Sequence, residues 1–265
     1  MWWFQQGLCF LPVALVIWTA ASFVFAYVTA VLLRHVDPLV PYISDTGTMA
    51  PERCVFGIML DVSAFLGMAT VYVRYKQVEA LTTADEVTLH RDSLGMCVVA
   101  NFQKTTLFSM HLVGAVLTFG VGALYIVVQT LISSKMQPHI NSKSIYLIRL
   151  GVGVWTMSSI ISMFISSVIM YSSLPGEDLP HKLHWTPGEV GYTAHIISTV
   201  SEWSLAFSFI SFFLTYIRDF QKINLRAEVN LQSAHLYDCP HGGAAATRQH
   251  KREASESSPL LSGGI

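Results

Sequence analysis

The chain has 265 residues, of which 52% are hydrophobic and only 12% are charged, and its formal net charge at pH 7 is −1. Soluble domains carry about 25% charged residues, so this composition argues against a soluble globular protein and favours a membrane protein with several spans. The near-neutral charge and the lack of a basic stripe argue against nucleic-acid binding. The four cysteines show neither metal-ligand spacing nor a disulfide framework, and we expect no metal or other cofactor.

Residues 8–33 form the first expected span. The opening 33 residues contain no Lys, Arg, Asp, Glu or His, and about 20 apolar residues suffice for a helix to cross a bilayer. A cleaved signal peptide is the alternative, but no basic residue precedes the apolar stretch, the stretch is too long, and no small-x-small site follows it. We therefore expect a retained span, with Trp2, Trp3 and Arg34 at its edges.

Four further stretches are long and apolar enough to cross a bilayer. They are residues 54–73, 107–132, 150–171 and 194–217. The third of these is rich in Ser and Gly, which favours close packing of helices in a membrane. The run Leu94–Phe102 covers only about half a bilayer, so it is a doubtful span that could instead be interfacial or re-entrant.

The sequence therefore predicts an all-α fold, a polytopic transmembrane helix bundle over residues 1–217, followed by a cytosolic and largely disordered tail over 218–265. Basic residues near span ends indicate the orientation. With six spans and a cytosolic amino terminus, nine Lys and Arg residues lie inside, Arg74 and Arg149 among them, and four lie outside. With five spans and an external amino terminus the counts are eight and five, so six spans are slightly favoured.

Four stretches resemble the damage-regulated autophagy modulator family. They are PYISDTGT (Pro41–Thr48), VYVRYKQV (Val71–Val78), VANFQKTTLF (Val99–Phe108) and EWSLAFSFISFFLTYIRDFQ (Glu202–Gln221). The resemblance implies six spans, both termini in the cytosol, a lysosomal or endosomal membrane, and promotion of autophagy without enzymatic activity. In one departure, HRDSLGMC stands where the family has a full apolar span before VANFQ, so about a dozen residues are missing. An altered splice form or a gene-model error would explain this.

The tail ends in ESSPLLSGGI, which resembles an acidic dileucine sorting signal made of Glu256, Leu260 and Leu261. In such a signal the two leucines fill an apolar pocket on a clathrin adaptor, while the acid meets a basic patch. The alternative is an inert leucine pair in a disordered segment. The sequence thus predicts a clathrin adaptor as one partner, beside the lipid bilayer and an unidentified part of the autophagy machinery.

Asp61, His195 and Glu202 are ionisable residues inside expected spans. Ionisable groups at membrane depth are costly, so they are read as functional by default. The acids could line an ion or lipid path, or each could be satisfied by polar groups on neighbouring helices. We favour the structural use, because the sequence shows no inverted repeat or broken helix pair of the transporter type. His195 and Glu202 are seven residues apart, which places them on one helix face.

The loop at 34–53 carries six candidate residues of the family stretch. They are Tyr42, Ser44, Asp45, Thr46, Gly47 and Thr48. Its Asp-Thr-Gly matches an aspartic-protease signature in three letters, but that chemistry needs two aspartates sharing a proton, and no second such motif exists. We expect turn geometry or a lumenal contact surface instead.

Three histidines, His35, His181 and His184, fall in segments that the six-span arrangement places in the lumen. Histidine ordinarily titrates near pH 6.5, so these side chains would gain charge in an acidic compartment. The sequence leaves open whether they sense pH or are inert surface residues.

We interpret the chain as an endolysosomal multi-span protein that promotes autophagy as a non-enzymatic regulator or scaffold. One alternative is a lipid or ion transporter that uses Asp61 and Glu202. The other is an adaptor for a phosphoinositide kinase, because related branches of the wider superfamily are linked to such kinase complexes.

Overall fold

Five helical segments of the described chain are long and apolar enough to cross a membrane. The computed structural model describes residues 7–39, 41–81, 108–137, 142–176, 178–221 and 223. Among these residues the fold is all helix and loop, without a strand, which confirms the predicted all-α bundle. The stretch 94–102, the predicted sorting signal and nearly all of the tail lie outside the described residues.

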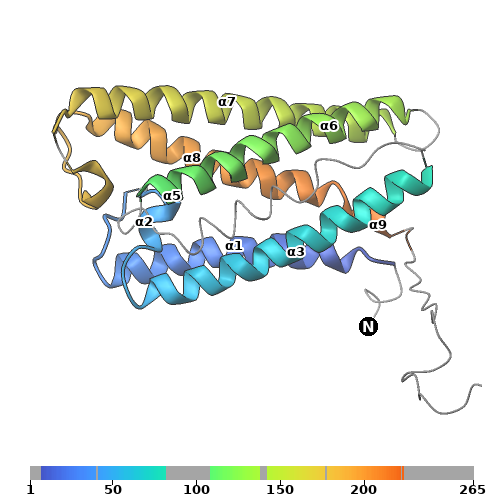
Figure 1. Ribbon diagram of the computed structural model, residues 1–265, viewed down its shortest axis with the longest axis horizontal. Coiled ribbons are helices and arrows are strands. Elements are labelled where there is room, and N and C mark those ends of the chain that lie inside the picture. The colour runs from blue at the N-terminus through green and yellow to red at the C-terminus, as the bar shows by residue number, and fades with distance from the viewer. Residues whose placement is uncertain are drawn as a thin grey trace, which may run out of the picture. The chain divides into compact units, whose positions relative to one another are not determined.

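The five segments appear in Figure 1 as long antiparallel and parallel rods. They are α1 (Phe10–Leu32), α3 (Glu52–Leu81), α5 (Phe108–Val116) continuing through a π-helical turn (Leu117–Val121) into α6 (Gly122–Lys135), α7 (Lys143–Ser173) and α8 (Tyr192–Leu214). Three short helices lie near their ends: α2 (Ile43–Thr46), the 3₁₀ turn Leu179–His181, and α9 (Ile217–Phe220).

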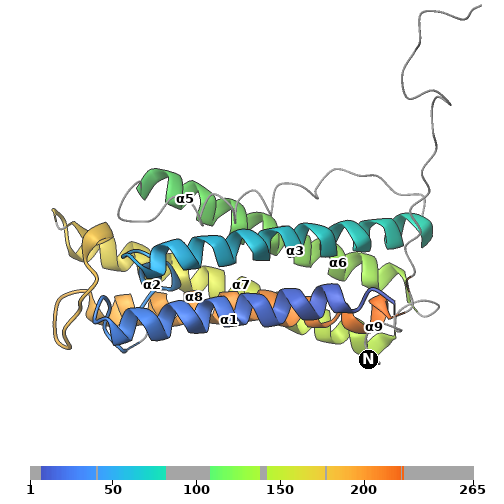
Figure 2. The same cartoon turned by 90° about the horizontal axis from the view of Figure 1, so that it is seen from below.

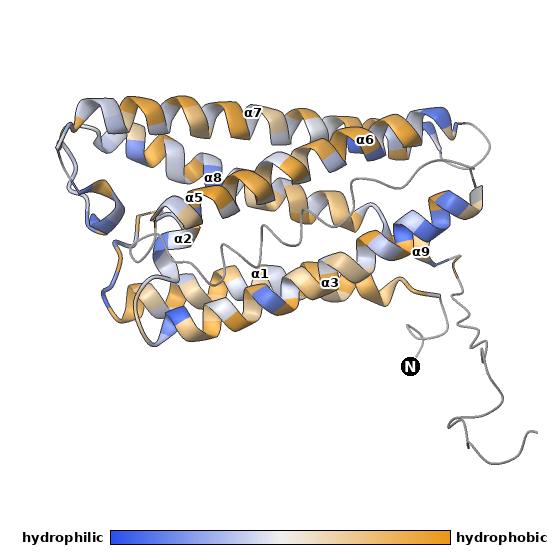
Figure 3. Cartoon of the chain, in the orientation of Figure 1, coloured by the Kyte–Doolittle hydropathy of each residue, from blue (hydrophilic) through white to orange (hydrophobic). Residues whose placement is uncertain are grey.

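Large apolar side chains point outward along the helices, and polar ones point inward. Phe65 and Phe164 are 66% and 67% exposed, whereas Ser22 and Thr156 are fully buried. Figure 3 shows the apolar colour spread along the long helices, with the most polar residues gathered mainly towards the helix ends and in the loops. Soluble proteins rarely expose apolar surface on this scale, so the arrangement fits a bundle surrounded by lipid.

Helices α3 and α5–α6 run in the same direction. Arg74, near the end of α3, donates to Gln129, near the end of α6, over 3.2 Å. Phe108, at the beginning of α5, packs against Tyr171 near the end of α7, with ring centroids 6.4 Å apart. Leu81 and Phe108 therefore lie at opposite ends of the bundle, as Figures 1 and 2 also show.

The amino-terminal side of α1 and the end of α8 lie together. The backbone N–H of Leu8 donates to the carbonyl of Phe220 over 3.0 Å. We call this the terminal end of the bundle, and the opposite end, where α2 lies, the capped end. The beginning of α1 and the end of α8 thus lie on the same side of the bundle, as the six-span arrangement with both termini on one side predicts.

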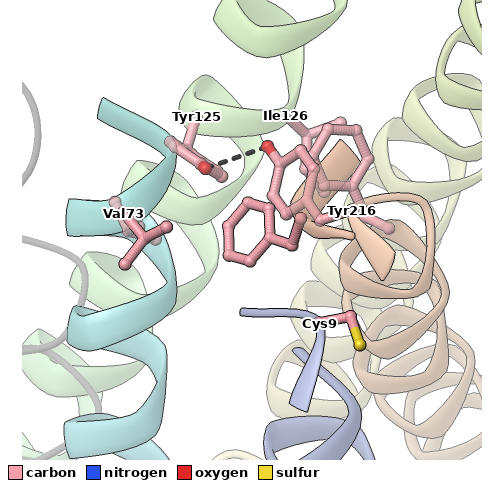
Figure 4. Packing of buried hydrophobic residues seen from close by; sticks show 8 residues of the cluster. Cys9, Val73, Tyr125, Ile126 and Tyr216 are labelled. Carbon is pink, nitrogen blue, oxygen red and sulfur yellow. Dashed lines mark hydrogen bonds between the residues drawn. The ribbon is translucent and has the colours of Figure 1, made fainter. Parts of the chain in front are cut away.

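An aromatic cluster closes the terminal end (Figure 4). Its buried members come from α3, α6, α8 and α9 and from the residues just before α1 and α9. They are Cys9, Val71, Val73, Tyr125, Ile126, Phe212, Tyr216 and Phe220. The hydroxyls of Tyr125 and Tyr216 are hydrogen-bonded at 2.9 Å, so each buried phenol finds a polar partner. The cluster ties the last turns of α8 and α9 to the rest of the bundle.

Helices α7 and α8 are joined by a ladder of hydroxyl groups. The paired residues are Thr156 with Ser208, Ser159 with Ser204, Ser162 with Ser201, and Ser167 with Ser198, at 2.7–3.0 Å. Small side chains let the backbones approach, and each interhelical hydrogen bond in a membrane contributes about 0.6 kcal/mol. The Ser-rich composition of α7 is thus used for packing against α8.

Candidate functional site at the capped end

The loop between α1 and α3 folds over the capped end and carries α2. The indole N–H of Trp203 donates to the carbonyl of Pro41 over 2.8 Å, and the backbone N–H of Ile43 donates to Glu202 Oε2 over 2.7 Å. Glu202 and Trp203 are consecutive residues of α8. One turn of that helix therefore holds the beginning of the PYISDTGT stretch at two points.

Glu202 supplies a hydrogen-bond acceptor for the first backbone N–H of the short helix α2. The first N–H groups of any helix have no partner within the helix, and a carboxylate beside them is favourable because it also meets the positive end of the helix dipole. Glu202 is 8% exposed and accepts the first N–H of α2. The acid that the sequence singled out as intramembrane is thus engaged with a segment 159 residues earlier in the chain.

His195 lies on the same buried face of α8 as Glu202 and contacts the two loops of the capped end. Its ring stacks on Trp185 with centroids 4.3 Å apart and planes 10° from parallel. The ring of Tyr42 meets it edge-on at 5.2 Å. Burial raises the pKa of the Tyr42 phenol, so Tyr42 stays a neutral hydroxyl at physiological pH. His195 and Glu202 thus contact the residues on either side of the start of α2.

Four of the six predicted loop residues are buried: Asp45, Thr46, Gly47 and Thr48. Tyr42 and Ser44 are half-buried. This burial favours turn geometry over an open contact surface. A cavity lies between α1, α3, α5 and α8, and Glu202 is one of the residues that line it. Asp61 is half-buried on α3 and does not line this cavity, so the structure gives these two acids different surroundings.

Gly47 has no room for a side chain, because a Cβ there would lie 2.0 Å from Cδ1 of the buried Phe56. We expect Gly47→Ala to lower the free energy of unfolding by about 1–3 kcal/mol, the usual cost of overpacking a core. Gly151→Ala on α7 is the control, since nothing lies within 4 Å of its Cβ position. Thermal unfolding of the two purified variants measures the difference, and equal unfolding temperatures would contradict the close fit.

The loop between α7 and α8 is tied to the first loop through Asp37. Its carboxylate accepts the backbone N–H of Trp185 over 2.6 Å and lies 2.9 Å from His184 Nδ1. Lys182 Nζ lies 4.4 Å from the centroid of the Trp185 ring and 2.9 Å from Glu189. The two loops of the capped end therefore form one connected surface.

Each of the three histidines that were expected in the lumen has a carboxylate beside it. His35 contacts Glu52, His181 lies 2.9 Å from Asp178, and His184 lies 2.9 Å from Asp37. Each of these three side chains thus has a carboxylate of the same end of the bundle as a direct neighbour.

Glu189 offers a test of the loop at acid pH. The Thr186 hydroxyl and then Lys182 hold its pKa below its ordinary value of 4.5. A carboxyl whose pKa is lower in the folded state stabilises the fold above its unfolded pKa, and loses that effect as the pH falls through the folded value. We expect Glu189→Gln to speed hydrogen exchange in residues 182–191 modestly and equally at pH 7 and pH 5. An effect present at pH 7 but absent at pH 5 would contradict this.

A second polar cluster lies at the terminal end, and sequence reasoning missed it. Arg149 Nη2 lies 2.6 Å from Asp219 Oδ2, and Arg74 Nη1 lies 3.3 Å from the same oxygen. Both guanidinium groups also lie over the Tyr216 ring, at 5.0 and 5.3 Å. Both arginines fall near span ends, where the sequence predicts flanking charges, but Arg149 is 0% and Arg74 is 1% exposed. The sequence held one indication of this cluster: Arg74 and Asp219 both lie in stretches that carry the family resemblance.

Both clusters consist of contacts between helices and loops that are distant in the sequence. In the part of the chain that the structure describes, no three His, Cys, Asp or Glu residues are grouped so that they could hold a metal ion. The polar residues instead join helices and loops. The bundle is therefore a polytopic membrane protein whose two ends are each held by buried polar contacts between distant segments.

The chain belongs to the family described as Frag1/DRAM/Sfk1/Cwh43P N-terminal domain, whose model matches residues 7–223. It is 55% identical to the human DNA damage-regulated autophagy modulator protein 2 over 253 residues, covering 91% of this chain and 95% of that protein. It is 39% identical to the Xenopus laevis modulator protein 1 over 240 residues, covering 86% and 97%. No solved structure matches the chain. The family resemblance drawn from the four stretches is confirmed.

The alignment with the human relative also bears on chain length. The alignment has 253 positions, but only 91% of this chain's 265 residues take part in it, which is about a dozen fewer. Within the aligned region the relative therefore has about a dozen residues that this chain lacks. The same number is expected to be missing before Val99, a position outside the described residues.

Proposed function

We propose that this chain modulates autophagy from a lysosomal or endosomal membrane, as a non-enzymatic regulator or scaffold. The observation that carries the proposal is the 55% identity to a protein named an autophagy modulator, over 95% of that protein's length. Three of the four family stretches also supply the buried contacts of the two ends: Pro41–Thr48 with Glu202, and Arg74 with Asp219. The stretches that carry the family resemblance thus also supply buried contacts at both ends of the bundle.

Autophagic flux tests the regulatory role. Cells that lack their own relative of this family would be given the full chain, and turnover of an autophagosome marker would be measured with and without lysosomal inhibition. The proposal expects turnover to rise relative to cells given an empty vector. Unchanged turnover, at normal abundance of the chain in lysosomal membranes, would contradict it.

Lysosomal delivery through the tail is a separate part of the proposal, with Glu256, Leu260 and Leu261 as the signal read by a clathrin adaptor. We expect the double change Leu260→Ala, Leu261→Ala to move most of the protein from lysosomes to the cell surface. Surface biotinylation and lysosomal colocalisation measure the shift. Ser257→Ala with Ser258→Ala is the matched control in the same tail. Unchanged colocalisation of the leucine variant would remove the signal from the account.

A further inference from the structure

We propose that the cavity between α1, α3, α5 and α8 binds a small neutral phenol, that is, a single aromatic ring that carries a hydroxyl group. The ring would fill the apolar space, and its hydroxyl would pair with the hydroxyl of Thr19 on α1. This inference goes beyond the proposed function and does not depend on it.

The volume of the cavity limits the size of its guest. It is about 160 Å³, and the described residues that wall it are almost all apolar. An engineered apolar cavity of roughly 150 Å³ stays free of water and binds benzene or xenon. A guest with one six-membered ring therefore fits the cavity, whereas a lipid with a long hydrocarbon chain does not.

Aromatic rings make up much of the cavity wall. The phenylalanines that line it come from α1, α3, the π-helical turn and α8, and are Phe23, Phe56, Phe119, Phe209 and Phe213. The rings of Phe119 and Phe209 stack with their centroids 6.3 Å apart. Aromatic rings attract one another in offset and edge-to-face geometries beyond the area that they bury. An aromatic guest is therefore favoured over an aliphatic guest of the same size.

The hydroxyl of Thr19 gives this wall a polar position. Leu15, Thr19 and Phe23 follow one another at a spacing of four residues and all line the cavity, so Thr19 lies in the middle of the face that α1 presents to it. Thr19 is 7% exposed, and its hydroxyl oxygen is buried without a hydrogen-bond partner. A buried polar atom without a partner costs free energy, and a hydroxyl group on the guest would remove that cost.

Other polar residues of the lining are already engaged within the protein. The hydroxyls of Ser63 and Thr118 each donate to the backbone carbonyl four residues earlier, over 3.0 and 2.9 Å. The carboxylate of Glu202 accepts the backbone N–H of Ile43 over 2.7 Å. Thr19 is therefore the residue that we assign to the hydroxyl group of the guest.

The guest should be neutral, because a charged group would lose its hydration in an apolar cavity. A phenol group ordinarily titrates near pH 10, so it stays neutral at physiological pH and in acidic compartments. Small neutral aromatic molecules also dissolve in hydrocarbon, and the bilayer around the bundle can therefore supply them to a cavity between helices.

Two substitutions separate the role of the space from that of the hydroxyl. Thr19→Val keeps the shape of the side chain and removes its hydroxyl group. Gly67→Leu fills the cavity, since Gly67 lines it on α3 and nothing in the described chain lies within 4 Å of the position of its Cβ. Gly151→Leu is the matched control, because Gly151 on α7 also has open space but does not line the cavity.

The experiment compares phenol with toluene, which has the same size and a methyl group in place of the hydroxyl. Radiolabelled probes are dialysed to equilibrium against the full chain in detergent, with protein-free micelles as the blank. We expect Thr19→Val to lower the affinity for phenol relative to toluene about fivefold, the effect of one net hydrogen bond. Gly67→Leu should abolish binding of both probes, and Gly151→Leu should leave both unchanged.

Three results would overturn the proposal. The first is that neither probe binds the unmodified chain above the blank. The second is an unchanged ratio of the two affinities in Thr19→Val, because the hydroxyl would then not be recognised. The third is binding that survives Gly67→Leu in a folded protein; if that variant unfolds, the ratio in Thr19→Val still decides. The readout is binding in detergent, so its failure is separate from failure of the flux or sorting tests.

Discussion

Replacing Asp219 by alanine is expected to destabilise the bundle by roughly 3–5 kcal/mol, the usual cost of removing one partner from a buried ion pair. The change would leave two buried guanidinium groups, Arg74 and Arg149, without the single carboxylate that they share. Chemical unfolding of the purified chain in detergent measures the loss. We also expect lower abundance in cells, because a loss of this size is a large part of the stability of most domains.

Two variants at the same site sharpen the comparison. Arg218→Ala removes an exposed charge one residue away, and surface changes of this kind usually stay within about 0.5 kcal/mol. Asp219→Asn keeps an oxygen that accepts hydrogen bonds from both arginines, so it should fall between the alanine variant and the unmodified protein. If Asp219→Ala cost no more than about 1 kcal/mol, the pairs would behave as solvated surface contacts.

Replacing Glu202 by alanine is expected to loosen the segment 41–48, which carries α2, from α8. The backbone N–H of Ile43 would lose its acceptor, and a buried donor left unsatisfied costs about 1–3 kcal/mol. Hydrogen exchange in residues 41–48 should become faster, while exchange at the terminal end of α8 should stay the same. Glu202→Gln should restore slow exchange, since its amide oxygen can still accept the N–H.

Val200→Ala is the control for the Glu202 variants, because Val200 is on the same helix but is 48% exposed. It should leave exchange at 41–48 unchanged. Unchanged exchange in Glu202→Ala would mean that Trp203 and Pro41 hold the loop without help from the carboxylate. Equal acceleration in the alanine and glutamine variants would point to the charge of Glu202 rather than its hydrogen bond.

Composition and run length were enough to predict a helical membrane bundle and the presence of α1, α3, α5–α6, α7 and α8. A backbone in lipid must satisfy its own hydrogen bonds, so apolar runs of about 20 residues have few alternatives to a helix. The family stretches were equally visible, because they are contiguous in sequence. None of this depends on which helices are neighbours.

Only the tertiary structure decided what the polar residues do. Helical periodicity assigned Glu202 to a face of α8, but not the partner, Ile43, which lies 159 residues earlier. Length and charge placed Arg74 and Arg149 at span ends, where basic residues normally face water or lipid head groups. Their burial follows from packing that brings Asp219 within reach, 145 and 70 residues away. The sequence alone specified the helices and their faces, and the pairing of those faces decided which charges could be buried together.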